Sequence, residues 1–285
     1  MAAFFSKIDL HSHSNASDGS FTPTQLVQRA VDRGLTHLAL TDHDSVGGVK
    51  EALEAADGRI NIIPGAELSA TWNNQLVHIV GLFLDIENAD LKKFLEKQKE
   101  IRIQRAVAIG EKMERQGFKN AYEECKKRAA PGASITRGNY AKYIVEMGRA
   151  QGTDDAFNTY LKKGKSCYVN TVWGGIEEPV KAIKSAGGVA VLAHPRRYTL
   201  TNTKLRALIE DFKMVGGEGI EVASSQMKQD DRVYLGELCR KYDMLASLGS
   251  DFHNVGPFRE LGLNLILEED LKKVWSVPAA LKYNF

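Results

Sequence analysis

Residues 8–13 read Ile-Asp-Leu-His-Ser-His and set a pattern that recurs along this 285-residue chain. A short apolar run typical of a buried strand ends here in two histidines. Because side chains alternate along a strand, Asp9, His11 and His13 project to one face. Two imidazoles spaced in this way make a good metal chelate, but structural histidines explain such a pair about equally well when it stands alone.

Six further apolar runs of strand length follow, at residues 38–40, 60–63, 76–84, 188–192, 219–222 and 244–248. Helical patterns lie between several of them, at residues 24–33, 50–56, 177–186, 202–215 and 230–242. Alternating strands and helices predict a parallel α/β architecture. Seven units favour a distorted β/α barrel, one strand short of the usual eight, with an open doubly wound sheet as the alternative. The alternative is weakened because no Gly-x-Gly-x-x-Gly motif follows a strand.

Residues 95–165 interrupt this pattern with continuous helical sequence. We expect them to form a helical insert that caps a barrel made of residues 1–94 and 166–285. The insert has 16 Lys and Arg against 9 Asp and Glu, a net +7, which leaves −5 for the barrel out of a total of +2. The near-neutral total excludes a globally polybasic nucleic-acid binder, but it leaves room for a local basic patch.

The chain has no apolar run long enough to span a membrane, and its N-terminus lacks the features of a signal peptide. We therefore expect a cytoplasmic protein that makes no membrane contact, and no motif indicates an obligate protein partner. Cys125, Cys167 and Cys239 are far apart in sequence and form no Cys-x-x-Cys pair, so reduced thiols are expected.

Six of the seven predicted strands carry His, Asp or Glu at or near their C-terminal ends, where catalytic residues of β/α barrels lie. Taken alone, Asp18 reads as a turn residue and His78 as a core histidine, and His37, at the start of a strand, is expected to be structural. The candidate metal ligands are His11, His13, Asp18, His43, Glu67, His78, His194, Asp251 and His253. Nine oxygen and nitrogen donors exceed the needs of one ion, so we expect two or three, of Mn²⁺, Fe²⁺ or Zn²⁺ type.

Clustered divalent ions activate water and neutralise phosphate oxygens, which suits phosphoester hydrolysis. Cationic anchors for such a substrate are Arg196 and Arg197, the Thr-Arg-Gly-Asn segment at 136–139, and the three lysines in 162–165. Solvated surface explains each of these about equally well, except Arg197, which closely follows a candidate ligand.

The ordered motifs resemble the polymerase and histidinol phosphatase (PHP) family of phosphoesterases. They are Asp-Leu-His-Ser-His at 9–13, Ser-Asp-Gly at 17–19, Thr-Asp-His-Asp at 41–44, Pro-Gly-Ala-Glu at 64–67, Val-His-Ile-Val-Gly at 77–81, Ala-His-Pro at 193–195 and Gly-Ser-Asp-Phe-His at 249–253. The insert, with Thr-Arg-Gly at 136–138 and Tyr-Leu-Lys-Lys-Gly-Lys at 160–165, is similar to one bacterial branch. That branch contains 5′-3′ exoribonucleases that trim ribosomal RNA and phosphatases of nucleoside 3′,5′-bisphosphates.

The resemblance implies a distorted seven-stranded barrel and a Mn²⁺-preferring site. It groups His11, His13, Glu67 and Asp251 around one ion, Glu67, His78 and His194 around a second, and Asp18, His43 and His253 around a third. Arg137, Lys165 and Arg197 match positions that contact substrate phosphate. Asn139 replaces a histidine of the relatives and leaves a neutral amide as a phosphate contact, and Arg196 replaces a glycine. A hydroxide that bridges the metal ions is expected as the nucleophile, with Asp251 or His253 managing protons.

Three functions remain open. The first is hydrolysis of the 3′-phosphate ester of 5′-phosphorylated nucleotides, with 5′-phosphorylated RNA ends and nucleoside 3′,5′-bisphosphates as substrates. The second is a small-metabolite phosphatase of the histidinol phosphatase type, which needs no basic insert. The third is a non-catalytic, metal-stabilised RNA-binding module, in which losing a histidine ligand would leave RNA binding intact.

Overall fold

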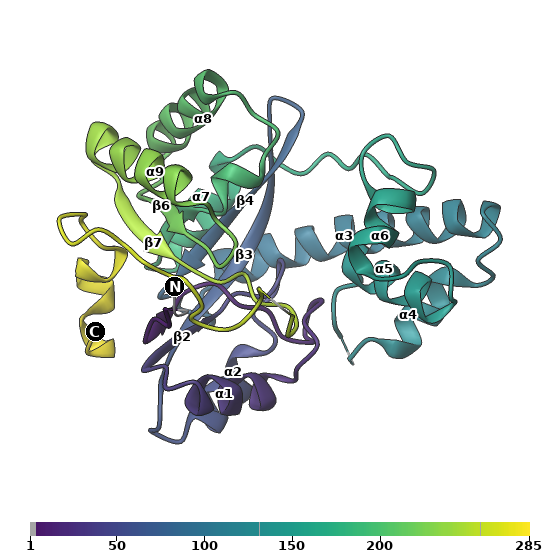
Figure 1. Ribbon diagram of the computed structural model, residues 1–285, viewed down its shortest axis with the longest axis horizontal. Coiled ribbons are helices and arrows are strands. Elements are labelled where there is room, and N and C mark those ends of the chain that lie inside the picture. The colour runs from purple at the N-terminus through teal and green to yellow at the C-terminus, as the bar shows by residue number, and fades with distance from the viewer. Residues whose placement is uncertain (1–3, 131, 257) are drawn as a thin grey trace.

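Seven strands form one sheet in chain order in the computed structural model, which describes residues 4–130, 132–256 and 258–285 (Figure 1). Beyond the two edge strands, Ser12 pairs with Phe252 in parallel, and the Leu10 amide donates to the Leu248 carbonyl at 3.2 Å. The sheet therefore curls into a nearly closed barrel, which confirms the predicted distorted seven-stranded β/α barrel over the open sheet. The strands are β1 (Ile8–Asp9), β2 (His37–Leu40), β3 (Asn61–Trp72), β4 (Gln75–Leu82), β5 (Val189–Leu192), β6 (Gly219–Ala223) and β7 (Leu245–Leu248).

One strand runs against the predicted parallel arrangement. β3 continues to Trp72, well past the predicted end of this strand, and β4 returns antiparallel to it. The turn between them is Asn73-Asn74, with φ angles of 44° and 61°. Two central residues with positive φ suit the right-handed twist of a two-residue hairpin, and asparagine tolerates them better than most residues. As a consequence, Glu67 and His78 lie within strands and not at strand ends.

The helices that cover the barrel begin and end within one residue of the predicted positions. They bury the apolar stripes that the sequence pattern indicated, for example Leu26, Val27 and Ala30 in the first of them. Thr22 and Gln25 cap this helix reciprocally. Figure 1 shows α8 and α9 on one side of the sheet and α1 and α2 on another. The bounds are α1 (Pro23–Asp32), α2 (Val49–Ala56), α7 (Glu177–Ser185), α8 (Asn202–Met214) and α9 (Gln229–Tyr242).

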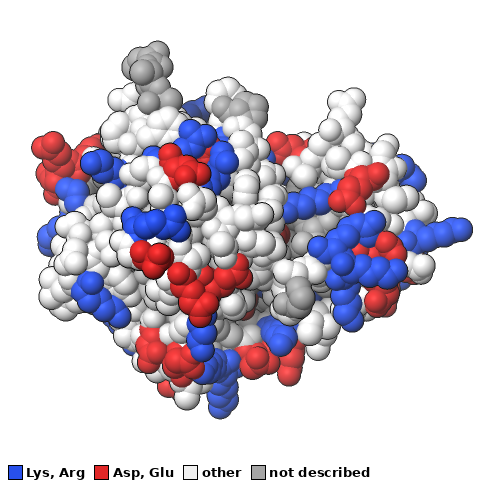
Figure 2. All heavy atoms as spheres, turned by 90° about the horizontal axis from the view of Figure 1, so that it is seen from below, with Lys and Arg blue, Asp and Glu red and all other residues white. Residues whose placement is uncertain are grey.

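The insert lies beside the barrel and has an apolar core of its own, which includes Met113, Phe118, Tyr140 and Ile144 (Figure 1). The boundary predicted at residue 95 falls within α3, a continuous helix that begins on the barrel and ends in the insert. In Figure 2, Lys and Arg side chains gather over the insert at the right, interspersed with acidic ones. The insert contains α3 (Ala89–Arg115), α4 (Ala121–Arg128), α5 (Arg137–Glu146), α6 (Thr153–Ala156) and the π-helix η1 (Phe157–Leu161).

The end of the chain closes the barrel at the side away from the candidate ligands. Nε2 of His37 lies 2.8 Å from the Tyr283 carbonyl oxygen, and the His37 ring stacks on Phe285. Short 3₁₀-helices occur at η2 (Pro195–Arg197), η3 (Val274–Ser276) and η4 (Pro278–Tyr283). Among the described helices, none has the length and apolar character required to span a membrane.

Candidate metal centre

The nine candidate ligands converge on one end of the barrel. His11 and His13 follow β1, His43 follows β2, and their rings lie close together, with the His13 centroid 5.1 Å from His11 and 4.6 Å from His43. The ring centroids of His13 and His253 are 4.1 Å apart, although 240 residues separate them. The strand order explains this meeting, because the segments that follow β1 and β7 pair where the barrel closes.

Three groups of these side chains bring their ligand atoms within 4.8 Å of one another. The first has the same four members as one of the sets that the family resemblance implied. The second contains His43 where the resemblance had His194, although His194 Nε2 lies 2.8 Å from Glu67 Oε1. The third adds His13 to the set expected. The groups are His11, His13, Glu67 and Asp251; His43, Glu67 and His78; and His13, Asp18, His43 and His253.

The donor atoms themselves fit metal binding. Nitrogen and oxygen atoms approach closely, as between His43 Nδ1 and Glu67 Oε2 at 2.8 Å, without the geometry of a hydrogen bond. Buried polar atoms normally have partners, and unpartnered ones are rare. Within the described ranges, buried atoms lacking a hydrogen-bond partner include His11 Nε2, both ring nitrogens of His13, Asp18 Oδ1, His43 Nδ1, Glu67 Oε2, His78 Nδ1, His194 Nδ1 and Asp251 Oδ1. The cluster is therefore able to hold metal ions.

The electrostatics of the cluster favour cations. Burial alone would raise the pKa of Glu67, but His78, His43 and His11 surround the carboxylate and hold its pKa well below the usual range. For Asp251, burial is likewise outweighed by Arg197 and His11, and its pKa is also lowered well below normal. Both carboxylates are thus anionic at neutral pH and buried, a state that costs free energy unless positive charge lies against them.

A supporting residue absent from the sequence prediction is Glu221 on β6, the strand that had no predicted ligand. Its Oε2 lies 2.8 Å from Nδ1 of His11, and both side chains are buried. A carboxylate acceptor requires a proton on Nδ1, which leaves the Nε2 lone pair free to bind a metal. The sequence signal was weak, because Glu221 is a single acidic residue inside an apolar run.

The three ionisable side chains of the Thr-Asp-His-Asp segment contact three different parts of the protein. His43 turns toward the cluster, while Asp42 accepts hydrogen bonds from the Ser14 amide at 2.8 Å and from the Ser17 hydroxyl at 2.6 Å. Asp44 accepts a hydrogen bond from Arg102 Nε at 2.6 Å. Asp42 therefore fixes the loop that carries Asp18, and Asp44 joins the insert to the barrel.

Two of the candidate ligands have a left-handed backbone conformation. His194 and Asp251 have φ angles of 30° and 52°, in the left-handed region that non-glycine residues seldom adopt, although Asn, Asp and His adopt it more often than the others. The approach of neighbouring chain segments is also tight, because a Cβ at Gly249 would lie 2.1 Å from Cβ of His11. The fold thus tolerates unfavourable local geometry where the ligand side chains meet, as is common in functional sites.

A cavity of about 290 Å³, which we call the arginine cavity, opens beside the cluster and is lined by Arg102, Arg105, Arg137 and Arg197. Arg102 is paired with Asp44, and Arg197 forms an ion pair with Asp251. Arg105 and Arg137 have no acidic partner among the described residues. Burial, followed by the charges of Arg137 and Arg102, lowers the pKa of Arg105, and its buried Nε lacks a hydrogen-bond partner there. Arg105 was not predicted, since no motif marks it within the insert.

Three other residues that were predicted to contact substrate phosphate do not face the cluster. Lys165 is exposed and lines neither cavity next to the cluster. The Asn139 side chain accepts a hydrogen bond from the Thr136 amide at 2.7 Å and so completes the capping box of α5. Arg196 donates to Asp231 at 2.6 Å on α9 and stacks on Tyr234, so it supplies no charge to the cluster.

Comparison with known proteins places these residues in a family. A PHP domain model matches residues 9–95. A 5′-3′ exoribonuclease from Haemophilus influenzae is 42% identical over 270 residues, which cover 94% of this chain and 98% of that protein. A 3′,5′-nucleoside bisphosphate phosphatase from Chromobacterium violaceum is 38% identical and is covered to 95% by the match, which spans 94% of this chain.

A solved structure supports the same family relationship. A structure described as an amidohydrolase from Chromobacterium violaceum, with bound sulfate and no metal, matches with a TM-score of 0.90 and 38% identity over 95% of both chains. The related proteins are hydrolases, which confirms the prediction of an enzyme and sets aside the non-catalytic module. The chain therefore belongs to the PHP family of metal-dependent phosphoesterases.

Proposed function

We propose that this enzyme hydrolyses the 3′-phosphate ester of nucleotides that carry a 5′-phosphate. Its substrates would be nucleoside 3′,5′-bisphosphates and RNA with a 5′-monophosphate, including the 5′ ends of ribosomal RNA in the cytoplasm. The observation that carries the proposal is the pair Arg105 and Arg137, two guanidiniums without acidic partners among the described residues, in a cavity that also reaches Glu67 and His78. Such a pair suits bidentate binding of a second phosphate next to the reacting one.

Both activities are one reaction in this scheme. Water attacks the phosphorus of the 3′-phosphate, the bond from phosphorus to O3′ breaks, and O3′ takes up a proton. A bisphosphate then yields inorganic phosphate and a nucleoside 5′-phosphate. RNA yields the same nucleoside 5′-phosphate, and the shortened strand keeps the phosphate at its new 5′ end, where it becomes the next substrate.

The ligand set, proposed as His11, His13, Asp18, His43, Glu67, His78, His194, Asp251 and His253, contains nitrogen and oxygen donors and no thiolate, which favours Mn²⁺, with Fe²⁺ and Zn²⁺ as the alternatives. Bound ions of this kind lower the pKa of a water ligand and neutralise charge on phosphate oxygens. We propose that Arg197, which lines the arginine cavity and contacts Asp251, holds a non-bridging oxygen of the reacting phosphate.

Asp251 and His253 are the groups we propose for proton transfer, because both line the arginine cavity at its boundary with the cluster. Burial would lower the pKa of His253, but Asp18 and Asp251 raise it to about 9. Its Nε2 lies 3.2 Å from Asp18 Oδ1. Of the other predicted contacts, Arg137 keeps its proposed role toward phosphate. Lys165 and Asn139 are proposed only as contacts for a longer substrate that reaches the surface of the insert.

The direct test compares substrates with and without the 5′-phosphate. Mn²⁺-loaded enzyme would be assayed with adenosine 3′,5′-bisphosphate against adenosine 3′-monophosphate, and with 5′-phosphorylated against 5′-hydroxyl RNA. We expect kcat/KM to be at least about 100-fold higher when the 5′-phosphate is present, the effect of one charge-assisted bidentate contact. Equal rates would contradict the anchor. Faster hydrolysis of histidinol phosphate than of any nucleotide would favour the small-metabolite alternative.

A further inference from the structure

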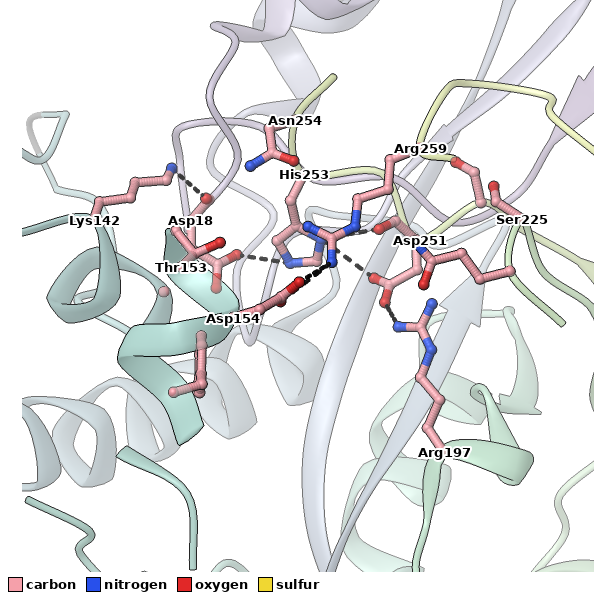
Figure 3. A pocket seen from close by; sticks show the side chains of 14 residues that line it. Asp18, Lys142, Thr153, Asp154, Arg197, Ser225, Asp251, His253, Asn254 and Arg259 are labelled. Carbon is pink, nitrogen blue, oxygen red and sulfur yellow. Dashed lines mark hydrogen bonds and ion pairs between the residues drawn. The ribbon is translucent and has the colours of Figure 1, made fainter. Parts of the chain in front are cut away.

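A second cavity, of about 380 Å³, adjoins the metal cluster (Figure 3). We call it the polar cavity. It shares Asp18, Arg197, Asp251 and His253 with the arginine cavity, so the cluster borders both. Its other walls come from three separate parts of the chain, namely the segment after β6, the loop after β7 and the insert. They contribute Lys142, Thr153, Asp154, Ser225, Gln226, Asn254 and Arg259.

Lys142 and Arg259 in the polar cavity already have polar partners, whereas Arg105 and Arg137 in the arginine cavity have no acidic partner among the described residues. Lys142 Nζ donates to the carbonyl oxygens of Asp18 and Gly19, at 2.7 and 3.1 Å. Arg259 Nη2 lies 3.3 Å from both carboxylate oxygens of Asp154. The polar cavity is therefore a poor place for a terminal phosphate dianion, which needs uncompensated positive charge.

Neutral hydrogen-bonding groups complete this cavity. Ser225 is buried, and among the described residues its hydroxyl has no hydrogen-bond partner, an arrangement that leaves a donor and an acceptor for a ligand. Figure 3 shows Asn254 and Ser225 on opposite sides of Arg259. Groups of this kind suit ribose hydroxyls and base edges, and the ring of Phe157 at the shared wall offers a surface for stacking.

We propose that the polar cavity binds the RNA strand downstream of the reacting phosphate, the strand that remains when the first nucleotide leaves. This inference rests on the proposed function. A bisphosphate has only a free oxygen at that side of its 3′-phosphate and reaches the polar cavity no further than the wall that the two cavities share. RNA has a nucleotide there, followed by a diester phosphate with a single negative charge.

Arg259 is the residue that receives this downstream phosphate. Its pair with Asp154 is long, and the two side chains are 39% and 80% exposed. Exposed ion pairs contribute little to stability, so an incoming phosphate can replace the Asp154 carboxylate at small cost. Since Arg259 follows β7 and Asp154 lies in α6 of the insert, a strand bound between them contacts both units of the protein.

The test measures the ratio of kcat/KM for a 5′-phosphorylated RNA pentamer to kcat/KM for adenosine 3′,5′-bisphosphate. We expect Arg259→Gln to lower this ratio about tenfold and to reduce the salt dependence of RNA cleavage by about one phosphate contact, with Arg259→Lys restoring part of the loss. Asp154→Asn keeps the cation and should leave the ratio unchanged or raise it. Arg240→Gln is the matched control, because Arg240 also pairs with exposed acids, Glu268 and Asp270, outside both cavities.

A ratio unaffected by Arg259→Gln would overturn the assignment, as would an equal loss with Asp154→Asn, which would show that the ion pair itself matters. If the wild-type enzyme cleaves neither substrate, the proposed function fails and the assignment falls with it. If wild type cleaves both and only the ratio test fails, the proposed function stands and the polar cavity has no role in strand binding.

Discussion

His11 Nδ1 and Glu221 Oε2 lie 2.8 Å apart, and this buried contact connects β6 to the cluster of candidate metal ligands. The carboxylate holds the imidazole with its Nε2 toward the other candidate ligands, so it would act through His11 on a metal ion bound there. Outer contacts of this kind are worth about 10- to 100-fold in metal affinity. Glu221 is therefore a positioning residue, and its loss should be detectable in metal binding as well as in turnover.

We expect Glu221→Gln to weaken Mn²⁺ binding by about 10- to 100-fold, measured by calorimetry on metal-free protein. Glu218→Gln is the control, because Glu218 pairs with Lys184 on the outside of the barrel. A thermal melt without metal would verify that both variants fold. Unchanged Mn²⁺ affinity in Glu221→Gln would show that the contact is purely structural.

Arg105→Gln removes from the arginine cavity a guanidinium that has no acidic partner among the described residues. We expect kcat/KM for a nucleoside 3′,5′-bisphosphate to fall by about 10- to 100-fold, since hydrogen bonds to charged groups contribute roughly 1.5–3 kcal/mol. Hydrolysis of a 3′-monophosphate, which lacks the second phosphate, should change much less. Arg115→Gln on the exposed end of the same helix is the control. Equal losses with the two substrates would contradict a role in binding the 5′-phosphate.

Metal removal should destabilise the protein, because the side chains of Glu67 and Asp251 are buried anions whose charge the proposed ions would offset. At a free Mn²⁺ concentration of 100 times Kd, binding to the native state adds about 2.7 kcal/mol and raises Tm by roughly 5–10 °C. The measurement is a thermal melt with chelator and with increasing Mn²⁺. A Tm independent of Mn²⁺ concentration would show that the cluster does not bind this ion.

The three thiols should resist modification in the native protein. All are buried, and burial raises the pKa of Cys125 and of Cys239 to about 12 and also raises the pKa of Cys167. Because the thiolate is the reactive form and a pKa of about 12 lies far above 8, the thiolate population of Cys125 and Cys239 at pH 8 is very small, and the raised pKa of Cys167 lowers its thiolate population as well. Reaction with a disulfide reagent at pH 8 should be slow in buffer and complete, at three thiols per chain, in denaturant. Rapid reaction of one thiol in buffer would reveal local opening at that site.

Gly249→Ala places a methyl group 2.1 Å from Cβ of His11. The segments must separate, and overpacking of this kind costs roughly 1–3 kcal/mol and displaces a proposed ligand. We expect lower stability to urea together with weaker Mn²⁺ binding. Gly152→Ala, at a position where an added Cβ meets no neighbour, is the control. An Mn²⁺ affinity equal to that of wild type would mean that the segments around Gly249 and His11 accommodate the methyl group without displacing the proposed ligand.

The sequence predicted the site best where the alternation of side chains along a strand and the order of strands in the barrel place residues at the same position. Strand period placed His11 and His13 on one face, and the barrel rule predicted that groups after other strands, such as His43 and His253, would join them. The direction of β4 was missed because it depends on the two-residue turn at Asn73-Asn74, a hairpin signal that the longer alternation of strands and helices obscured. Glu221 and Arg105 have no motif, and only tertiary structure brings them to the cluster.

The continuous helix α3 has a consequence for selectivity. It packs Gln98 and Arg102 against Ser69 and Asp44 of the barrel, carries Arg105 one turn later, and continues into the core of the insert. An unbroken helix rises about 1.5 Å per residue and does not stretch. The backbone at Arg105 is thus held at a set distance from the barrel, and under the proposed function this distance would select one spacing between two phosphates on a ribose, whatever base the ribose carries.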